Sequence, residues 1–296
     1  METKNIRDYL QPGKRAHLVG IGGVSMASLA EVLHGTGVKV TGSDQKESAT
    51  VLHLRKLGIE VVIGHRSESI QGADCVVRTA AVHDSNPEIA AALEAGIPVF
   101  ERAQAWGAIM RDYKNALCIS GTHGKTTTTS MCTHIFMAAQ ADPTVMIGGT
   151  LPLLEACHRV GHGDTIILES CEYCNSFLSF FPTIAVILNV DADHLDFFKD
   201  LQDVEKSFRA FADLVPRNTG LIVANADDAN TMTTLRGEER PILTFGLAEG
   251  DVHAAGLTYE NGLPSFDIIH EGKPFAHVTL HVPGEHNVRN ALAAAA

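Results

Sequence analysis

A glycine-rich segment, Ser120-Gly-Thr-His-Gly-Lys-Thr-Thr-Thr-Thr129, carries the clearest chemical signal, because it lies between an apolar run and a predicted helix. Glycines let a backbone wrap around a phosphate, the start of a helix offers free N–H groups, and Lys125 adds a positive charge. Thr126 stands where phosphate-binding loops place the hydroxyl that binds magnesium. Ile119 occupies a position that usually holds glycine, so the pattern indicates a short variant of such a loop. We favour phosphate binding over a turn that only caps a helix.

Carboxylates follow two further predicted strands in the same half of the chain. Glu169 ends one apolar run, and Glu172 follows three residues later. The next apolar run leads into Asp191, Asp193 and His194. Parallel sheets bind ligands beyond the carboxyl ends of their strands, and magnesium prefers oxygen ligands. We therefore expect Glu169 and His194 to lie near Lys125 and to take part in a metal or phosphate site.

A second glycine-rich turn, Gly20-Ile-Gly-Gly-Val-Ser-Met26, joins the first predicted strand to the first predicted helix. Ser25 stands where the dinucleotide-binding pattern has its third glycine, and Ser43 and Asp44 end the next strand. The pattern favours a nucleotide or a nucleotide-sugar diphosphate over a bare turn. Two phosphate-binding loops indicate two different nucleotides. A nicotinamide-dependent dehydrogenase, the other interpretation of this turn, does not explain the loop around Lys125.

Short apolar runs alternate with amphipathic segments, which predicts an α/β fold. We expect a Rossmann-like, doubly wound N-terminal domain over residues 1–112. A P-loop ATP-binding α/β domain over residues 113–296 would follow and would include a small antiparallel β meander. The predicted strands span 16–21, 38–42, 60–63, 74–77, 97–100, 116–120, 165–168, 183–190, 220–225 and 241–246, and the meander lies within 257–282. The predicted helices span 24–35, 49–57, 87–95, 102–110, 125–139 and 204–214.

The composition of the 296 residues agrees with two globular domains, because 45% are hydrophobic and 20% are charged. The chain has 23 Lys and Arg against 35 Asp and Glu, and its formal charge of −12 disfavours nucleic acids and anionic membranes as partners. The polar N-terminus predicts no signal peptide, and no apolar run approaches the roughly 18 residues of a membrane span, so we expect a cytoplasmic protein. The six scattered cysteines favour reduced thiols, because only Cys171 and Cys174 have metal-site spacing.

Together these motifs resemble the Mur ligases of peptidoglycan synthesis over nearly the whole chain. The combination is far more specific than any one motif. The matching stretches are His17–Met26, Gly42–Asp44, Asn86–Glu88, Gly121–Thr127, Glu169 with Phe177-Leu178, Asn189–His194 and Gly284–Asn290.

The resemblance implies that the first domain binds a UDP-sugar and the second binds ATP with Mg²⁺. ATP would phosphorylate the lactyl carboxylate of UDP-N-acetylmuramate, and the amine of L-alanine would attack the acyl phosphate. The alanine-rich helix at the end of the chain has no stop signal, so we expect a third domain, which helps to hold the amino acid, to follow Ala296.

The resemblance also implies roles for individual residues. The catalytic residues would be Lys125, Glu169, Glu172 and His194. Thr126 would bind one magnesium ion, and Glu169 and His194 would bind a second one as a pair. The residues at ATP would be Gly121, Thr122, His123, Gly124, Lys125, Thr126 and Thr127, with His286, Asn287 and Asn290 on its adenine side. The residues at the UDP-sugar would be Gly20, Gly22, Gly23, Val24, Ser25, Met26, Ser43, Asp44, His65, Thr79 and Ala80. The loop from Gly20 to Met26 would hold its diphosphate, and Asp44 would lie near the uridine.

One departure from the family pattern is Cys171, which replaces the middle acid of a Glu-Ala-Asp-Glu-Ser run and indicates a divergent subgroup. The sequence offers no candidate for the carbamylated lysine of some other Mur ligases, which favours the alanine-adding type. Three alternatives stay open. The first is a sister ligase that attaches a preformed peptide to the same sugar nucleotide, or a folylpolyglutamate-type ligase. The second is a non-catalytic module that binds a UDP-sugar or ATP. The third is a dehydrogenase that uses the first domain and binds NAD.

Overall fold

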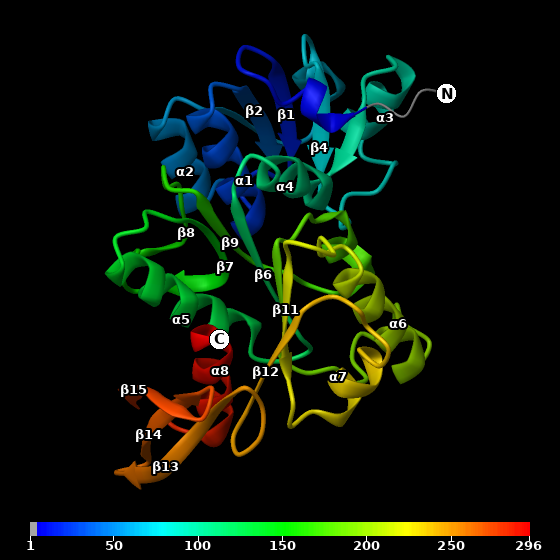
Figure 1. The fold of residues 1–296 in the computed structure, drawn as a ribbon. Coiled ribbons are helices and arrows are strands. Elements are labelled where there is room, and N and C mark those ends of the chain that lie inside the picture. The colour runs from blue at the N-terminus through cyan, green and yellow to red at the C-terminus, as the bar shows by residue number, and fades with distance from the viewer. Residues whose placement is uncertain (1–4) are drawn as a thin grey trace. The chain divides into compact units, whose positions relative to one another are not determined.

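The computed structural model describes residues 5–296, so residues 1–4 of the predicted N-terminal domain lie outside the described residues. The chain forms two compact units (Figure 1). The first unit extends to Asp112 and includes the short segment Cys157–Val160. The second unit comprises Tyr113–Ala156 and Gly161–Ala296.

A parallel five-stranded sheet with the order β3-β2-β1-β4-β5 forms the centre of the first unit. Its strands are β1 (Arg15–Val19), β2 (Lys39–Asp44), β3 (Glu60–Ile63), β4 (Cys75–Arg78) and β5 (Val99–Glu101). Its helices are η1 (Ile6–Asp8), α1 (Val24–Gly35), α2 (Ala49–Lys56), η2 (Ser67–Ile70), α3 (Pro87–Glu94) and α4 (Arg102–Met110). The strand order reverses at β1, and open α/β sheets bind ligands beyond the carboxyl ends of strands at such a point. The predicted doubly wound fold is confirmed.

Local sequence signals fix the start of α3, which matters for the site described below. The Asn86 side chain accepts a hydrogen bond of 2.9 Å from the backbone N–H of Glu88, and Pro87 occupies the first helical position. Proline suits that position because its missing N–H would have no helical partner there. The cap therefore places Glu88 in the first turn of α3.

The second unit contains a larger sheet, in which nine strands have the order β15-β14-β13-β12-β11-β10-β6-β9-β7. Strands β6, β7, β9, β10, β11 and β12 run parallel to one another, β13 pairs with β12 in parallel, and β14 runs antiparallel to both β13 and β15. The parallel strands are β6 (Asn115–Ser120), β7 (Thr144–Leu151), β9 (Thr165–Glu169), β10 (Ile184–Ile187), β11 (Leu221–Asn225) and β12 (Ile242–Gly246). The remaining strands are β13 (Val252–Glu260), β14 (Leu263–His270) and β15 (Lys273–Thr279).

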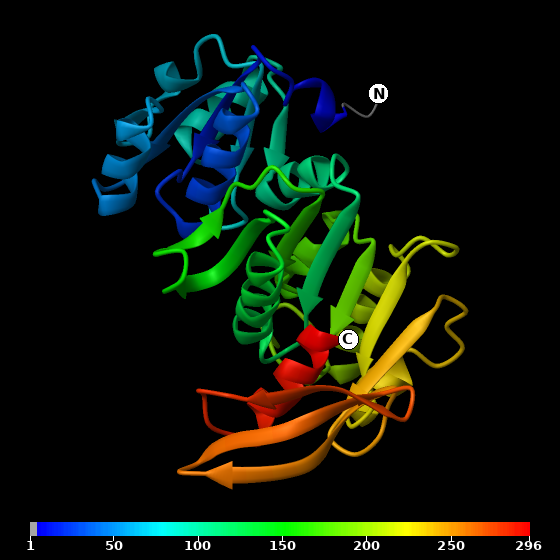
Figure 2. The same ribbon diagram turned by 60° about the vertical axis from the view of Figure 1, so that its left-hand side comes forward.

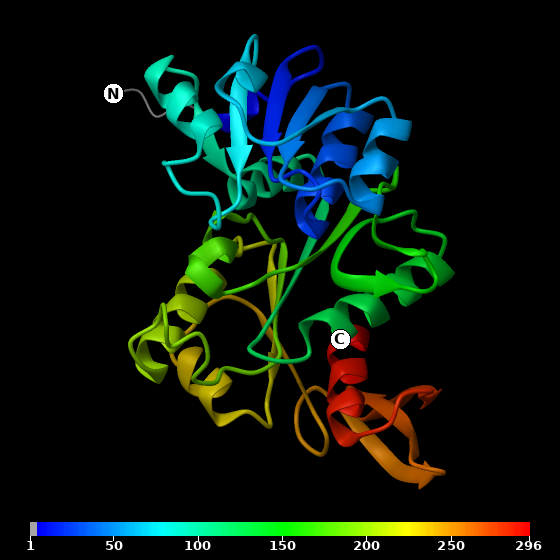
Figure 3. The same cartoon turned by 180° about the vertical axis from the view of Figure 1, so that it is seen from behind.

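Five helices accompany this sheet: α5 (Lys125–Ala138), η3 (Tyr173–Ser179), α6 (Leu201–Ala212), α7 (Ala229–Thr234) and α8 (Glu285–Ala295). The apolar face of α6 packs on η3, where the ring of Phe177 stacks on Phe211 with centroids 4.5 Å apart and meets Phe208 edge-on. Helices α6 and α7 lie side by side (Figure 3). Burial of these three aromatic rings anchors η3, which follows the strand that ends in Glu169.

The predicted antiparallel meander is confirmed, and both of its turns are built as its sequence indicates. Asn261 and Gly262 have φ angles of 51° and 82°, and Glu271 and Gly272 have φ angles of 50° and 71°. Two successive positive φ angles are what a two-residue hairpin turn requires. Figure 2 shows the meander in orange and α8 in red beside α5, and α8 contacts α5, β12 and β13.

Six elements are not predicted by the sequence pattern: β7, the short strand β8 (Ala156–Arg159), α7 and the 3-10 helices η1, η2 and η3. Gly148 and Gly149 make β7 a poor strand by propensity. It forms because Thr144, Val145 and Met146 pair with β9. Within the described part of the chain, every helix is too short or too polar to cross a membrane.

Candidate functional site

The loop between β6 and α5 has the backbone geometry that its glycines indicate. Gly121 has a φ of 141°, and a Cβ atom there would lie 2.8 Å from the Cβ of Leu188. Gly124 has a φ of 88°, and a Cβ there would lie 2.6 Å from the Oδ1 of Asn290. Because Gly124 directly precedes α5, the first N–H groups of that helix are available to an anion.

Asn189, beyond the end of β10, fixes this loop from the opposite side. Its Oδ1 accepts a hydrogen bond of 2.8 Å from the N–H of His123, and its Nδ2 donates one of 3.0 Å to the carbonyl of His123. The N–H of Thr122 donates to the Asn189 carbonyl over 3.1 Å. Asn189 belongs to a stretch that carries the family resemblance, but no role was predicted for it. Its contacts hold the loop in shape before any phosphate binds.

Lys125 sits at the centre of a charged cluster. Its Nζ donates to the carbonyl of Gly121 over 2.6 Å and lies 3.0 Å from the Oε2 of Glu172. The Glu172 side chain is 2% exposed, and its Oε1 lies 3.7 Å from the Nε2 of His194. The structure therefore brings the predicted residues Lys125, Glu172 and His194 together, and the buried carboxylate compensates the charge of the lysine.

Glu169 forms a second pair of contacts beside the same loop. Its Oε1 accepts a hydrogen bond of 3.0 Å from the hydroxyl of Thr126, and its Oε2 accepts one of 2.6 Å from the N–H of Gly148. A Cβ on Gly148 would lie 2.6 Å from the carboxylate, so only glycine leaves room for it. A hydroxyl and a carboxylate are the hard oxygen donors that Mg²⁺ prefers, and these two groups fit that ion.

His194 contacts Glu172, whereas the resemblance implies that it pairs with Glu169 at a metal. Among residues 5–296, no group of three His, Cys, Asp or Glu side chains is arranged to hold a metal ion by itself. Thr126 and Glu169 are thus the pair that the structure brings together, and metal binding by His194 stays a prediction.

The predicted adenine-side residues lie at the start of α8. Asn287 and Asn290 are buried, and the Nδ2 of Asn290 donates to the Oδ1 of Asn287 over 3.1 Å. The close approach of Asn290 to Gly124 places this pair against the phosphate loop. His286 is exposed, and no contact links it to the loop among the described residues.

In the first unit, the turn after β1 is held by the end of β2. The N–H groups of Gly20 and Ile21 donate to the carbonyl of Ser43, and the N–H of Gly22 donates to the Oδ2 of Asp44 over 2.8 Å. A Cβ on Gly22 would lie 2.8 Å from the same oxygen. Asp44 therefore shapes the predicted diphosphate turn as well as lying at the predicted uridine side.

A buried carboxylate, Glu88, links the two predicted substrate residues Ser43 and His65. Its Oε2 accepts a hydrogen bond of 2.5 Å from the Ser43 hydroxyl and lies 3.1 Å from the Nδ1 of His65. Its Oε1 lies 3.6 Å from the Nε2 of His17, and the Glu88 side chain is 0% exposed. Burial raises the pKa of Glu88, but contacts with His17 and Ser43 outweigh that effect and lower it to about 2. Sequence reasoning gave Glu88 no role, because its partners lie on three other elements.

The other predicted substrate residues differ in exposure. Val24 is 52% exposed next to the turn, whereas the Met26 side chain is 1% exposed and belongs to the core. The hydroxyl of Ser25 is buried without a hydrogen-bond partner among the described residues. Thr79 and Ala80 follow β4, whose carboxyl end lies at the same edge of the sheet as that of β1. Because its side chain is buried, Met26 can meet a ligand at this turn only through its backbone.

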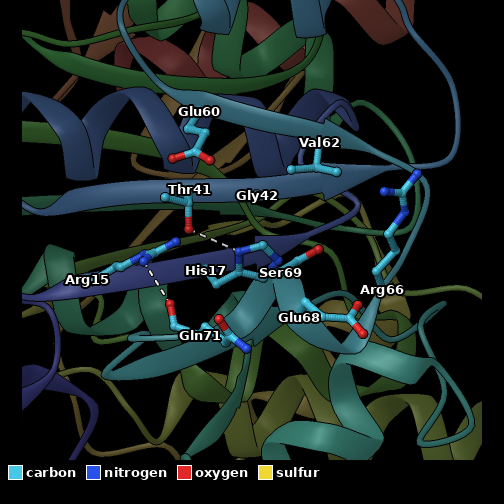
Figure 4. A pocket seen from close by; sticks show the side chains of 10 residues that line it. All are labelled: Arg15, His17, Thr41, Gly42, Glu60, Val62, Arg66, Glu68, Ser69 and Gln71. Atoms are coloured by element: carbon cyan, nitrogen blue, oxygen red, sulfur yellow. Dashed lines mark hydrogen bonds between the residues drawn. The ribbon is translucent and has the colours of Figure 1, made fainter.

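A cavity of about 560 Å³ opens elsewhere on the first sheet, lined by residues of β1, β2, β3 and η2 and of the turns beside them (Figure 4). His17 lines it and bonds Thr41 over 3.0 Å, and Arg15 bonds the carbonyl of Gln71 over 2.7 Å. None of the predicted substrate residues lines it. This cavity is thus lined by residues other than those of the predicted diphosphate turn.

Two models of known protein families match nearly the whole chain. Residues 15–114 match the family described as "Mur ligase family, catalytic domain", and residues 119–296 match "Mur ligase middle domain". The chain belongs to the Mur ligase family. The Mur ligase fold thus accounts for both units, each with its glycine-rich loop.

Two relatives of this Mur ligase chain carry the name UDP-N-acetylmuramate–L-alanine ligase. The protein from Caldanaerobacter subterraneus subsp. tengcongensis is 48% identical over 289 residues, which are 97% of this chain and 63% of that protein. The protein from Clostridium novyi is 45% identical over 280 residues, which are 95% of this chain and 61% of that protein. The chain spans about three-fifths of the length of these curated relatives.

Two solved Mur ligase structures resemble the chain over most of its length. The UDP-N-acetylmuramate-alanine ligase MurC from Thermotoga maritima has a TM-score of 0.80 at 32% identity, covering 95% of this chain and 63% of that one. The UDP-N-acetylmuramate:L-alanyl-gamma-D-glutamyl-meso-diaminopimelate ligase from Neisseria meningitides has a TM-score of 0.86 at 29% identity, covering 95% and 91%. Both support the α/β architecture described above.

Proposed function

We propose that this chain supplies the UDP-N-acetylmuramate site and the ATP site of an ATP-dependent ligase that joins L-alanine to the lactyl carboxylate of the sugar nucleotide. The observation that carries the proposal is the Lys125–Glu172–His194 cluster beside the phosphate loop of the second unit. Similarity to the relatives named UDP-N-acetylmuramate–L-alanine ligase supports the choice of substrates. Because the proposed reaction uses ATP and a nucleotide-linked precursor, we propose that it takes place in the cytoplasm.

The phosphate loop would receive the triphosphate of ATP. The first N–H groups of α5 and the ammonium of Lys125 are positive where the phosphate oxygens would lie. Thr126 and Glu169 would hold Mg²⁺, which when bound supplies positive charge to a transferring phosphoryl group. Asn287 and Asn290 would lie on the adenine side of the nucleotide.

In the proposed reaction, an oxygen of the lactyl carboxylate forms a bond to the terminal phosphorus of ATP, and the bond to ADP breaks. The amine of L-alanine then attacks the activated carbonyl, phosphate leaves, and the amine loses a proton. A carboxylate is already nucleophilic, so the chain has to align it and neutralise charge. Lys125 can do the latter because its ammonium is held in place by the Gly121 carbonyl and Glu172.

The first unit would bind the UDP moiety at the turn from Gly20 to Met26. His65, held by Glu88, would present a polar group at the uridine side next to Asp44, and the buried Ser43 would help to position Glu88. The prearranged cluster reduces the entropy that binding would otherwise cost.

A second candidate function is ligation of a preformed peptide to the same sugar nucleotide. The structural similarity to the Neisseria meningitides ligase, which this chain covers to 91%, favours it. A binding module without turnover is the third candidate. Phosphate release by a full-length version, given UDP-N-acetylmuramate and either L-alanine or the L-alanyl-gamma-D-glutamyl-meso-diaminopimelate peptide, separates the first two candidates. A lack of release with both acceptors would leave the third.

Binding of each nucleotide can be tested separately by calorimetry on the 296-residue chain. We expect both UDP-N-acetylmuramate and a non-hydrolysable ATP analogue with Mg²⁺ to bind. Lys125→Ala should abolish ATP-dependent turnover and weaken binding of the ATP analogue. Binding of the sugar nucleotide should be unaffected. Lys206→Ala, an exposed change on α6, is the matched control. Near-normal binding of the analogue by Lys125→Ala would contradict the proposal.

A further inference from the structure

A cluster of polar and ionisable side chains in the first unit takes no part in the proposed ligase reaction. It joins Cys157 and His158, in the segment Cys157–Val160, to Glu31 of α1. The Sγ of Cys157 lies 3.7 Å from the Nδ1 of His158. The Nε2 of the same imidazole lies 3.0 Å from the Oε2 of Glu31. A thiol, an imidazole and a carboxylate thus form a continuous chain of contacts.

The surroundings of this cluster hold the imidazole in one orientation. The side chains of His158 and Glu31 are only 12% and 15% exposed. The other carboxylate oxygen of Glu31 lies 3.2 Å from the Nε2 of His53, on α2. The segment rests on the end of α1, because a Cβ on Gly35 would lie 3.8 Å from Val160. With Nε2 facing a carboxylate, the Nδ1 of His158 is directed at the sulfur.

We propose that Cys157 is a nucleophilic thiolate and a site of covalent modification by soft electrophiles such as α,β-unsaturated carbonyl compounds. The arrangement of thiol, imidazole and carboxylate is the one that activates cysteine nucleophiles. The proposal does not depend on the ligase function, since the contacts that carry it join only α1, α2 and the segment Cys157–Val160.

Charge at the cluster agrees with a thiolate–imidazolium pair. The hydrogen bond to His158 lowers the pKa of Cys157 despite the opposing effect of burial, and the hydroxyl of Ser28, 3.9 Å from the sulfur, assists. Burial lowers the pKa of His158, but Cys157 and Glu31 outweigh it and raise the value to about 9. Burial raises the pKa of Glu31, and His158 and His53 more than reverse that effect.

Four other cysteines provide an internal contrast. Burial raises the pKa of Cys75, Cys118 and Cys132 to about 12 and also raises that of Cys171. Thiols with raised pKa values carry little thiolate at neutral pH and react slowly. Cys157 is therefore expected to react before these four.

The modification balances without an added oxidant or reductant. The sulfur of the Cys157 thiolate forms a bond to the β-carbon of the electrophile, and the π electrons of its double bond move to the carbonyl oxygen. The enolate then takes a proton from the His158 imidazolium. The products are a thioether and a neutral imidazole.

The test uses N-ethylmaleimide on the intact chain, with the modified peptide identified by mass spectrometry. We expect Cys157 to be labelled first at pH 7, about tenfold faster than any other cysteine. The pH at which its rate is half-maximal should lie below about 8.5, the value for an unperturbed cysteine. Cys157→Ser should remove the fast phase, and Cys171→Ser should leave it unchanged.

Two variants separate activation from exposure alone. His158→Gln and Glu31→Gln should each slow labelling of Cys157 by about tenfold at pH 7 and shift its pH profile upward. Circular dichroism checks that each variant is folded. If either variant unfolds, the pH profile of the unmodified chain still decides. A half-maximal pH at or above about 8.5, or faster labelling of another cysteine, would overturn the proposal.

Discussion

Replacing Glu88 by glutamine removes the buried charge that connects Ser43, His65 and His17 in the first unit. The change keeps the size of the side chain, so it leaves packing nearly unaltered and tests the charge itself. In the native protein Glu88 accepts a hydrogen bond from the hydroxyl of Ser43 and faces the imidazoles of His17 and His65. We expect Glu88→Gln to lower the free energy of unfolding of this unit and to weaken binding of UDP-N-acetylmuramate.

The magnitude follows from the pKa of Glu88, which the fold lowers from 4.5 to about 2. One pKa unit corresponds to about 1.4 kcal/mol, so the carboxylate contributes about 3 kcal/mol to stability at neutral pH. Because the folded pKa is depressed, this contribution is present above pH 4.5 and is lost as the pH falls toward about 2. The difference between the native protein and Glu88→Gln should therefore shrink to about 1 kcal/mol at pH 3.

The assay is urea unfolding followed by tryptophan fluorescence at pH 7, 5 and 3. The chain has one tryptophan, Trp106, which is 1% exposed on α4 and reports on the first unit. Glu94→Gln is the matched control, since it makes the same chemical change at an exposed position of α3. A cost no larger than that of Glu94→Gln, or a cost that stays constant down to pH 3, would refute the reasoning.

Two further predictions concern the second unit. Gly148→Ala should weaken Mg²⁺-dependent binding of the ATP analogue by about tenfold or more, because the new Cβ would displace the Glu169 carboxylate. Gly149→Ala, whose Cβ would make an ordinary contact of 3.6 Å with Thr126, should bind normally, and equal affinities of the two variants would contradict this. Phe177→Ala should cost about 3–5 kcal/mol in calorimetric unfolding, because it removes the ring stacked on α6. Phe275→Ala, at a site 68% exposed, should cost little, and similar losses would argue against the stacking.

The sequence by itself determined the fold class and most of the elements. Apolar runs of four to six residues that alternate with amphipathic segments specify a parallel α/β sheet, because the burial of each element depends on its own period. Turns such as Asn261-Gly262 could also be predicted from the sequence, since the positive φ angles that they require are a local property. Glycine spacing likewise marked both loops, where a Cβ would collide with neighbouring atoms.

Tertiary structure alone decided which side chains meet. Strand β7 forms despite the low strand propensity of its glycines because it pairs with β9 by hydrogen bonds, and no local sequence pattern predicts that pairing. His194 contacts Glu172, whereas the family resemblance paired it with Glu169. Glu88 lies 45 residues from Ser43, and Cys157 lies 129 residues from Ser28, whose hydroxyl it contacts. Periodicity predicts which face of an element is buried, but the partners across that face are fixed only when separate elements pack together.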